Sequence, residues 1–328
     1  MQGLLAAQRP DAALHGDFQA AAIVLDTRTS EVLAWVGSRD WSDRDALGGN
    51  DGVTARRQAG SALKPFIYAR YLDDGHPVTS TFEDAPVAFD TPGGAYRPQN
   101  YDRHYHGTVT LRVALASSLN IPAIRALHAN GVKTTLDFLH ALGLATLDRS
   151  AEDYGLGLAL GDGDVRLVDL ANAYATLGRL GRWRPVTWTL GARPTGGGPD
   201  PLGLLERQVF SRDAALEILD ILSDDRARGI GFGHGGPLAL AYRVAAKTGT
   251  SSDYRDNWAF GVTPDYTVGV WVGNFDGRPM NRVSGPIGAS PLLRQIFQIL
   301  YPRAATRADV AWFPAPPHDA SRLGAASE

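Results

Sequence analysis

The order of the hydrophobic patterns constrains the fold of this chain more than any other feature. Two short apolar runs within residues 20–38 flank the turn-forming sequence Asp26-Thr27-Arg28-Thr29-Ser30 and predict a β-hairpin. Helical patterns dominate residues 108–190 and 211–225, and strand patterns then follow at residues 241–248, 256–263 and 266–274. Because strands near both ends of the chain bracket the helices, the sequence predicts one antiparallel sheet with a helical lobe inserted between its two parts.

Three further helix boundaries can be predicted from local signals. Pro65 is tolerated only in the first turn of a helix, so Ser61 is expected at or near the N-terminus of a helix that ends around Asp74-Gly75. Ser211 is the expected N-cap of the helix at 211–225, and a last helix is expected over residues 290–301. Residues 76–107 show little periodicity.

The charge balance and the missing cysteines exclude several classes of function. The formal net charge is -3 and no basic run exceeds Arg56-Arg57, so nothing favours nucleic acid or an anionic membrane surface as a partner. The absence of cysteine excludes disulfides and thiolate chemistry. No run of about 18 apolar residues is found, and the first 16 residues do not have the pattern of a signal peptide.

Lysine is rare in this chain and is placed selectively. Of the 32 basic residues only Lys64, Lys133 and Lys247 are lysines, and all the others are arginines. Arginine keeps its proton, whereas surroundings can convert lysine into a base or a compact cationic clamp. Lys133 is most simply a solvated surface residue, but the other two lie in motifs with hydroxyl residues, which suggests a chemical requirement.

The first motif is Ser61-Ala62-Leu63-Lys64. On a helix, positions i and i+3 share a face, so the hydroxyl and the amine can meet. A serine becomes a good nucleophile when a neighbouring base accepts its proton, and burial or a nearby positive charge can lower the pKa of a lysine enough for that role. A serine three residues before a lysine is nevertheless common by chance, so the motif alone is weak.

Two further motifs add specificity. Ser118-Leu119-Asn120 precedes Pro122 and is expected at a break between two helices, where a hydroxyl and an amide could face a cleft. Lys247-Thr248-Gly249-Thr250 follows an apolar run, and its glycine indicates close approach of another backbone or of a ligand to a strand. Taken singly, these are also compatible with an ordinary helix junction and with a turn-containing edge strand.

In this order the three motifs match S-x-x-K, S-x-N and K-T-G, which penicillin-binding proteins and serine β-lactamases share. The stretches AGSALKPFIYARYLDDG, YGLGLALG, VRLVDLANAYATLGRLGR and RDNWAFGVTPDYTVGVWVGNFDG also resemble the transpeptidase module of class A penicillin-binding proteins, most closely the 1C type. The resemblance covers roughly residues 18–302.

This resemblance implies an α+β fold of the three-layer α/β/α type, in which helices flank an antiparallel five-stranded sheet. It implies a penicillin-binding transpeptidase domain at 18–302 with an all-helical lobe at about 76–235, preceded by an N-terminal segment at 1–17 and followed by an Ala/Pro-rich tail or linker at 303–328. Class A proteins normally carry a membrane anchor and a glycosyltransferase domain before this module, and the 1C type a further C-terminal domain. The chain is therefore expected to be either a fragment or a reduced form of a periplasmic protein anchored to the inner membrane.

By the same resemblance, the expected activity is D,D-transpeptidation of peptidoglycan stem peptides that end in D-Ala-D-Ala. Ser61 would be the nucleophile and Lys64 its base, Ser118 would relay a proton, and Asn120 would hold the substrate amide. Lys247, Thr248, Gly249 and Thr250 would bind the substrate, with the backbone N–H groups of Ser61 and Thr250 as the oxyanion hole. β-Lactams would acylate Ser61, no metal or cofactor is expected, and cell-wall synthesis proteins are possible partners.

Several alternatives stay open at this point. A D,D-carboxypeptidase would use the same acylation site with water as the acceptor. A serine β-lactamase would need a residue such as Glu152 to position a hydrolytic water, although no asparagine follows Glu152 at the expected spacing. A non-catalytic penicillin-binding sensor or scaffold would keep the motifs without turnover.

Metal binding is poorly supported by the sequence. His104 and His106 lack a third ligand at a suitable spacing, and residues 161–164 (Gly-Asp-Gly-Asp) lack the full acidic pattern of a calcium loop.

Overall fold

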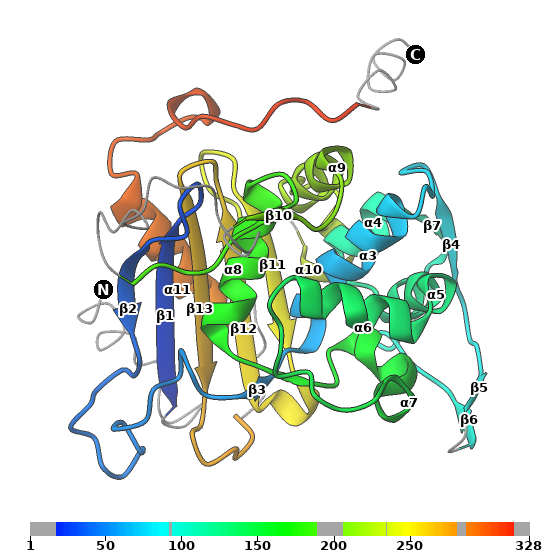
Figure 1. Cartoon of the computed structure of the whole chain (residues 1–328), viewed down its shortest axis with the longest axis horizontal. Coiled ribbons are helices and arrows are strands. Elements are labelled where there is room, and N and C mark those ends of the chain that lie inside the picture. Colours follow the sequence, from blue (N-terminus) through cyan, green and yellow to red (C-terminus); the bar gives the residue numbers. More distant parts are fainter. Residues whose placement is uncertain (1–17, 92–93, 189–205, 234, 281–286, 318–328) are drawn as a thin grey trace.

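The computed structural model describes residues 18–91, 94–188, 206–233, 235–280 and 287–317 (Figure 1). At its centre lies a five-stranded antiparallel sheet with the strand order β11-β12-β13-β1-β2. The strands are β1 (Gln19–Asp26), β2 (Val32–Val36), β11 (Ala245–Thr250), β12 (Asp256–Val262) and β13 (Tyr266–Gly273). The predicted α+β fold, with an antiparallel sheet completed from both parts of the chain, is confirmed.

Alternating side chains give the sheet two buried faces. Along β1, Ala21, Ile23 and Leu25 join the core that contains α8 (Leu167–Gly178), whereas Ala20, Ala22 and Val24 join the core that contains α11 (Ala289–Leu300). Figure 1 shows α8 in front of the sheet and α11 behind it. This arrangement produces the three layers.

Two glycines let these helices approach the sheet closely. A Cβ on Gly261 of β12 would lie 2.4 Å from a ring carbon of Phe297 on α11. A Cβ on Gly269 of β13 would lie 2.9 Å from Leu167 on α8. Both strand glycines are therefore packing positions on opposite faces of the sheet.

A mainly helical lobe lies beside the sheet, to the right in Figure 1. Within it, α3 packs against α5 and α9. Its helices are α3 (Lys64–Asp73), α4 (Leu111–Ala116), α5 (Asn120–Asn130), α6 (Val132–Ala141), α7 (Ala151–Tyr154), α9 (Arg212–Leu222) and α10 (Gly229–Phe232).

The expectation that this lobe is all helical is wrong, because it also contains short two-stranded ribbons. In one of them Thr81–Asp84 (β4) pairs with Gly107–Thr110 (β7) in register. Each strand has only four residues, which is too short to show a strand pattern. Its partner lies far away in the sequence, so no local hairpin signal is present either. The other ribbons pair β5 (Phe89–Thr91) with β6 (Gly94–Tyr96), β3 (Arg57–Gln58) with β8 (Asp164–Val165), and β9 (Arg182–Trp183) with β10 (Arg207–Gln208).

The local signals predicted most element ends well. Ser30 N donates to Asp26 O at 2.9 Å in the hairpin turn, and Ser211 Oγ accepts from Ala214 N at the start of α9. The strand expected at 241–248 instead covers Ala245–Thr250, because the K-T-G residues themselves pair with β12. No helix among the described residues is long and apolar enough to cross a membrane.

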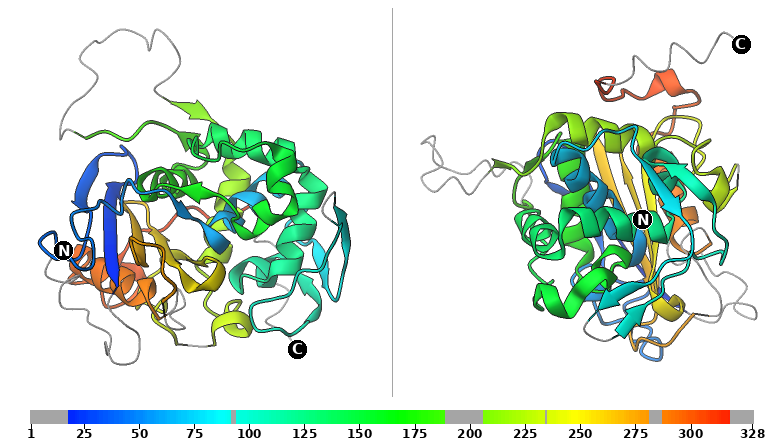
Figure 2. Two further views of the ribbon diagram at one scale, coloured as in Figure 1. Left: turned by 90° about the horizontal axis from the view of Figure 1, so that it is seen from below. Right: turned by 90° about the vertical axis from the view of Figure 1, so that its right-hand side faces the viewer.

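Part of the segment expected as a tail packs on the rest of the protein. Val310 is buried in the core of the α11 face, and the guanidinium of Arg243 lies 4.4 Å from the ring centroid of Trp312. The segment runs from the end of α11 across the top of the view in Figure 1, and the right-hand view of Figure 2 places it at the same edge of the molecule. The domain limits at 18–302 stay a prediction.

Candidate active site

Ser61 lies in a 3-10 turn, η1 (Gly60–Leu63), which continues directly into α3. Gly60 has φ +56°, and a Cβ there would lie 2.4 Å from Thr250 O. On the facing strand, a Cβ on Gly249 would lie 2.8 Å from Ala59 O and 3.0 Å from Ala62 N. The two glycines therefore let the backbone around Ser61 lie directly against β11.

A second segment supports this turn from the lobe. Ala59 N donates to Gly163 O at 3.1 Å, and Gly60 N donates to Gly161 O at 3.3 Å. Gly161 has φ +75°, and a Cβ there would lie 2.0 Å from Gly60 O. The Gly-Asp-Gly-Asp segment is thus placed as a brace for the turn that carries Ser61.

Lys64, at the start of α3, is fully buried and reaches the Ser118–Asn120 segment. Its Nζ donates to Ser118 O and to Asn120 Oδ1, both at 2.6 Å, and lies 3.5 Å from Ser118 Oγ. Its hydrogen bonds within the described residues go to this segment, so direct proton transfer from Ser61 to Lys64 stays a prediction.

Ser118 joins the two motif lysines. Lys247 Nζ donates to Ser118 Oγ at 2.9 Å and to Thr248 O at 2.6 Å. Ser118 has φ +59°, a left-handed conformation that costs a non-glycine residue on the order of 1 kcal/mol. The strained residue is the one that accepts hydrogen bonds from both Lys64 and Lys247, and strained backbone is frequent at functional sites.

Burial changes the acidity of both lysines. Burial, with the positive charge of Lys247 adding to it, lowers the pKa of Lys64 well below its usual range. Burial, with the charge of Arg228 adding to it, lowers the pKa of Lys247 to about 7. Both lysines therefore release a proton more readily than a free lysine, and Lys247 is near the midpoint of its titration at neutral pH.

A pocket of about 460 Å³ opens over these groups, a volume suited to a small ligand or a peptide end. Among the predicted site residues, Ser61, Ser118, Asn120, Thr248 and Thr250 line it, while Lys64 and Lys247 are buried. The other described lining residues are Asn100, Tyr101, Asp102, Ser117, Leu119, Leu160, Gly231, Phe232, Ser251, Ser252 and Ile287.

Gly249 does not line this pocket, because its missing side chain faces the Ser61 turn. The close contact of that turn with β11 puts the backbones of Ser61 and Thr250 on neighbouring segments, as the predicted oxyanion hole requires.

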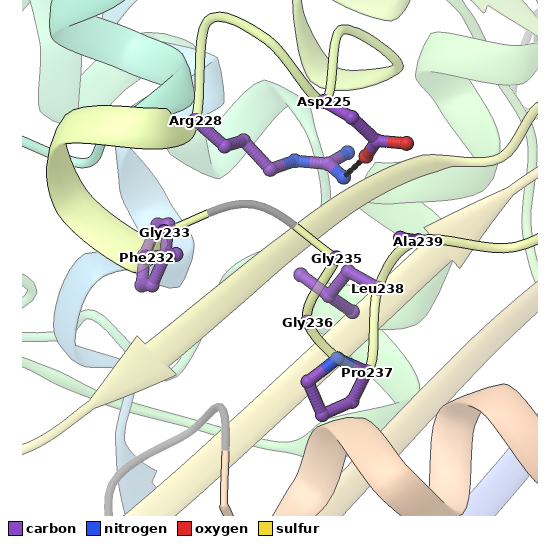
Figure 3. Close-up of a pocket in the computed structure, with 9 residues that line it drawn as sticks. All are labelled: Asp225, Arg228, Phe232, Gly233, Gly235, Gly236, Pro237, Leu238 and Ala239. Atoms are coloured by element: carbon purple, nitrogen blue, oxygen red, sulfur yellow. Dashed lines mark hydrogen bonds and ion pairs between the residues drawn. The ribbon is translucent and has the colours of Figure 1, made fainter.

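A much smaller cavity, of about 40 Å³, lies beyond α10 (Figure 3). Asp225 and Arg228 point into it and form an ion pair, and Arg228 is buried. The cavity is large enough only for one or two water molecules, so it is no competing substrate site.

The weaker sequence candidates lie elsewhere. His106 faces two carboxylates, with Nδ1 at 2.8 Å from Asp84 and Nε2 at 3.2 Å from Asp102. Glu152 is exposed in the first turn of α7 and is not among the residues that line the pocket. No group of three or more potential ligand side chains in the described ranges is arranged to hold a metal ion.

Two residues near the site were missed by sequence reasoning. Arg228 affects the pKa of Lys247, and Asn100 hydrogen-bonds the backbone of Asn120. Both lie in loops with no motif around them. For Asn100, the only available signal was a polar residue in a Pro-rich, aromatic loop.

Comparison with known proteins identifies a family. The family model described as the penicillin-binding protein transpeptidase domain matches residues 20–298. Penicillin-binding protein 1C of Escherichia coli K12 is 38% identical over 290 residues, which cover 87% of this chain and 35% of that protein. Penicillin-binding protein 4 of Bacillus subtilis 168 is 31% identical over 283 residues, 83% of this chain and 43% of that protein. The chain thus spans less than half the length of these relatives.

Solved structures show the same fold. The PonA1 protein of Mycobacterium tuberculosis in complex with penicillin V superposes with a TM-score of 0.75 at 23% identity, covering 96% of this chain and 84% of that one. Penicillin-binding protein 1A of Haemophilus influenzae gives a TM-score of 0.74 at 23% identity, covering 92% of this chain and 49% of that one.

Proposed function

This chain belongs to the penicillin-binding protein transpeptidase family, and on that premise we propose that it is a serine D,D-transpeptidase that cross-links peptidoglycan stem peptides. The observation that carries the proposal is the convergence of Lys64, Ser118 and Lys247 beneath a pocket that Ser61 lines. In the parent protein the domain would work in the periplasm, with β-lactams as covalent inhibitors.

In the acylation step, Ser61 Oγ attacks the carbonyl of the penultimate D-Ala. The bond from Oγ to carbon forms, the serine proton passes to Lys64 Nζ, and the backbone N–H groups of Ser61 and Thr250 stabilise the oxyanion. A neutral lysine has two N–H bonds and one lone pair. Because Ser118 O and Asn120 Oδ1 accept the two N–H bonds, the lone pair is left to take the proton.

In the breakdown step, the bond from carbon to nitrogen breaks and the leaving D-Ala amine receives the proton. Ser118 Oγ is suited to relay it, since Lys247 donates to this oxygen at 2.9 Å and Lys64 Nζ lies 3.5 Å away. Thr248, Thr250 and the protonated form of Lys247 would bind the terminal carboxylate. An amine of a second stem peptide then attacks the acyl-enzyme and restores the Ser61 hydroxyl.

The pocket also bears on the β-lactamase alternative. Asp102 is the one carboxylate among the described residues that line it, and this group is paired with His106. Glu152 is not in a position to activate a hydrolytic water there. A slow return from the acyl-enzyme is therefore expected, which favours a penicillin-binding enzyme over a β-lactamase.

The test is incubation with a fluorescent penicillin, followed by a denaturing gel and intact mass over several hours. A stable single adduct on Ser61, absent in a folded Ser61→Ala variant, is expected. Rapid drug hydrolysis would instead indicate a β-lactamase, and no adduct would indicate a scaffold. With a stem peptide and an amine acceptor, a cross-linked dimer is expected, whereas release of D-Ala alone would indicate a carboxypeptidase.

A further inference from the structure

The helix that begins with Asn120 has no cap of its own. The residue before it, Leu119, offers no side-chain acceptor to the free N–H groups of the first turn of α5. Asn100, from a loop twenty residues earlier, supplies one instead. Its Oδ1 accepts from Asn120 N at 2.8 Å and from Ile121 N at 3.5 Å.

Asp84, on β4, fixes the orientation of the Asn100 amide. Asn100 Nδ2 donates to the two carboxylate oxygens of Asp84 at 2.8 and 2.7 Å, and to His104 O at 2.8 Å. Asp84 is 0% exposed and Asn100 is 4% exposed. A reversed amide would set oxygen against carboxylate and N–H against N–H, so one orientation is strongly preferred.

His106 also contacts this carboxylate. Its backbone N and its Nδ1 lie 2.9 and 2.8 Å from Asp84 Oδ2, and its Nε2 lies 3.2 Å from Asp102. A buried carboxylate is costly without such donors. Because the buried carboxylate of Asp84 accepts these hydrogen bonds, the network holds the Asn100 side chain rigidly.

The same loop also holds the side chain of Asn120. Gln99 O accepts from Asn120 Nδ2 at 2.8 Å, and Asn120 Oδ1 accepts from Lys64 Nζ at 2.6 Å. Asn120 is thus fixed at its backbone by Asn100, at its amide nitrogen by Gln99, and at its amide oxygen by the catalytic lysine.

We propose that Asp84 and Asn100 are positioning residues for acylation, which hold Asn120 and through it set the position of Lys64. This inference rests on the proposed function. Although Asn100 lines the pocket, its amide oxygen and nitrogen are both engaged by the protein. It acts through Asn120 rather than by binding substrate.

The test is an exchange of the two side chains. Asn100→Asp alone sets two carboxylates against each other in a buried site. Asp84→Asn alone replaces one of the two carboxylate acceptors by an N–H donor, which leaves a single oxygen to accept from both Asn100 and His106. Each change is expected to slow acylation by a fluorescent penicillin by about 10- to 100-fold, the effect of a small misplacement of a catalytic group. In the double variant, the carboxylate at position 100 accepts from the N-terminus of α5 and the amide at position 84 donates to it. The hydrogen bond from position 100 to His104 O is not restored, so part of the rate is expected to return.

Two further measurements distinguish a positioning role from a loss of folding stability. The limiting acylation rate should fall while the penicillin concentration at half-saturation changes little. Asn172→Ala is the matched control, because Asn172 is also a buried asparagine that accepts from Ser30 and Arg179 and donates to Arg184 O, and it does not line the pocket. It should lower the melting temperature without changing the acylation rate of the folded protein.

The outcomes for the two claims are distinct. If both single variants fold and acylate at the wild-type rate, or if the double variant is no better than the slower single one, the positioning role is wrong. If the wild type itself is not labelled, the proposed function fails. In that case the NMR signal of labelled Lys64 Nζ still decides the positioning role, since it should shift in each single variant and return in the double.

Discussion

Replacing Lys247 with methionine should stabilise the folded protein in acid and neutral solution. Methionine keeps most of the buried hydrocarbon of the side chain but carries no charge. In the folded chain burial lowers the pKa of Lys247 to about 7 from the usual 10.5. At 1.36 kcal/mol per pKa unit, this difference corresponds to about 5 kcal/mol of destabilisation while the lysine is protonated in both states.

The sign of the pH dependence follows from where each state releases its proton. Below pH 7 the folded and unfolded chains both bind it, and the full cost is present. Between pH 7 and 10.5 only the unfolded chain binds it, so the contribution of Lys247 to wild-type stability rises with pH by about 1.4 kcal/mol per unit. Above pH 10.5 neither state binds the proton, and the destabilisation by Lys247 is absent.

The variant also loses the hydrogen bonds of Lys247 to Ser118 Oγ and Thr248 O, about 1 kcal/mol each at any pH. Lys247→Met should therefore be more stable than the wild type by about 3 kcal/mol at pH 6, and less stable by about 2 kcal/mol at pH 10.5.

Urea unfolding followed by tryptophan fluorescence at a series of pH values measures this difference. Lys133→Met is the control, because Lys133 is exposed and paired with Asp137, which raises its pKa. Its difference from the wild type should stay constant from pH 6 to 10. A Lys247→Met difference that changes by less than about 1 kcal/mol over the whole range would refute the reasoning.

Three further changes test the packing and charge around the site. Arg228→Gln removes a positive charge near Lys247 and should raise the pKa of Lys247, measured by NMR of labelled lysine; an unchanged titration would contradict the assigned cause. Gly249→Ala places a methyl group 2.8 Å from the backbone of the Ser61 turn and should slow penicillin acylation by about 10- to 100-fold, so wild-type acylation would disprove the packing role. Gly261→Ala collides with Phe297 on the far face of the sheet and should cost about 1–3 kcal/mol in urea unfolding, while acylation by the folded protein stays unchanged.

The sequence predicted the sheet and most helices because their signals are local. The hairpin around Asp26 and the N-cap at Ser211 are encoded by adjacent residues, and the structure has both. The ribbon of β4 and β7 was missed, because each strand is only four residues long and its partner is distant in sequence. The K-T-G residues were expected partly in a turn, but their pairing with β12 extends the strand to Thr250.

For the site, the sequence alone predicted which residues carry chemistry and determined their order along the chain, and those motifs sufficed to predict the family that comparison identifies. The tertiary structure decided what these residues experience. The lowered pKa of Lys64 arises from burial and from Lys247, a residue remote in sequence. The hydrogen bond that holds the backbone of Asn120 comes from a loop with no motif. Desolvation, Coulomb interactions and hydrogen bonds depend on distances in space, and these are fixed only when the sheet and the lobe pack together.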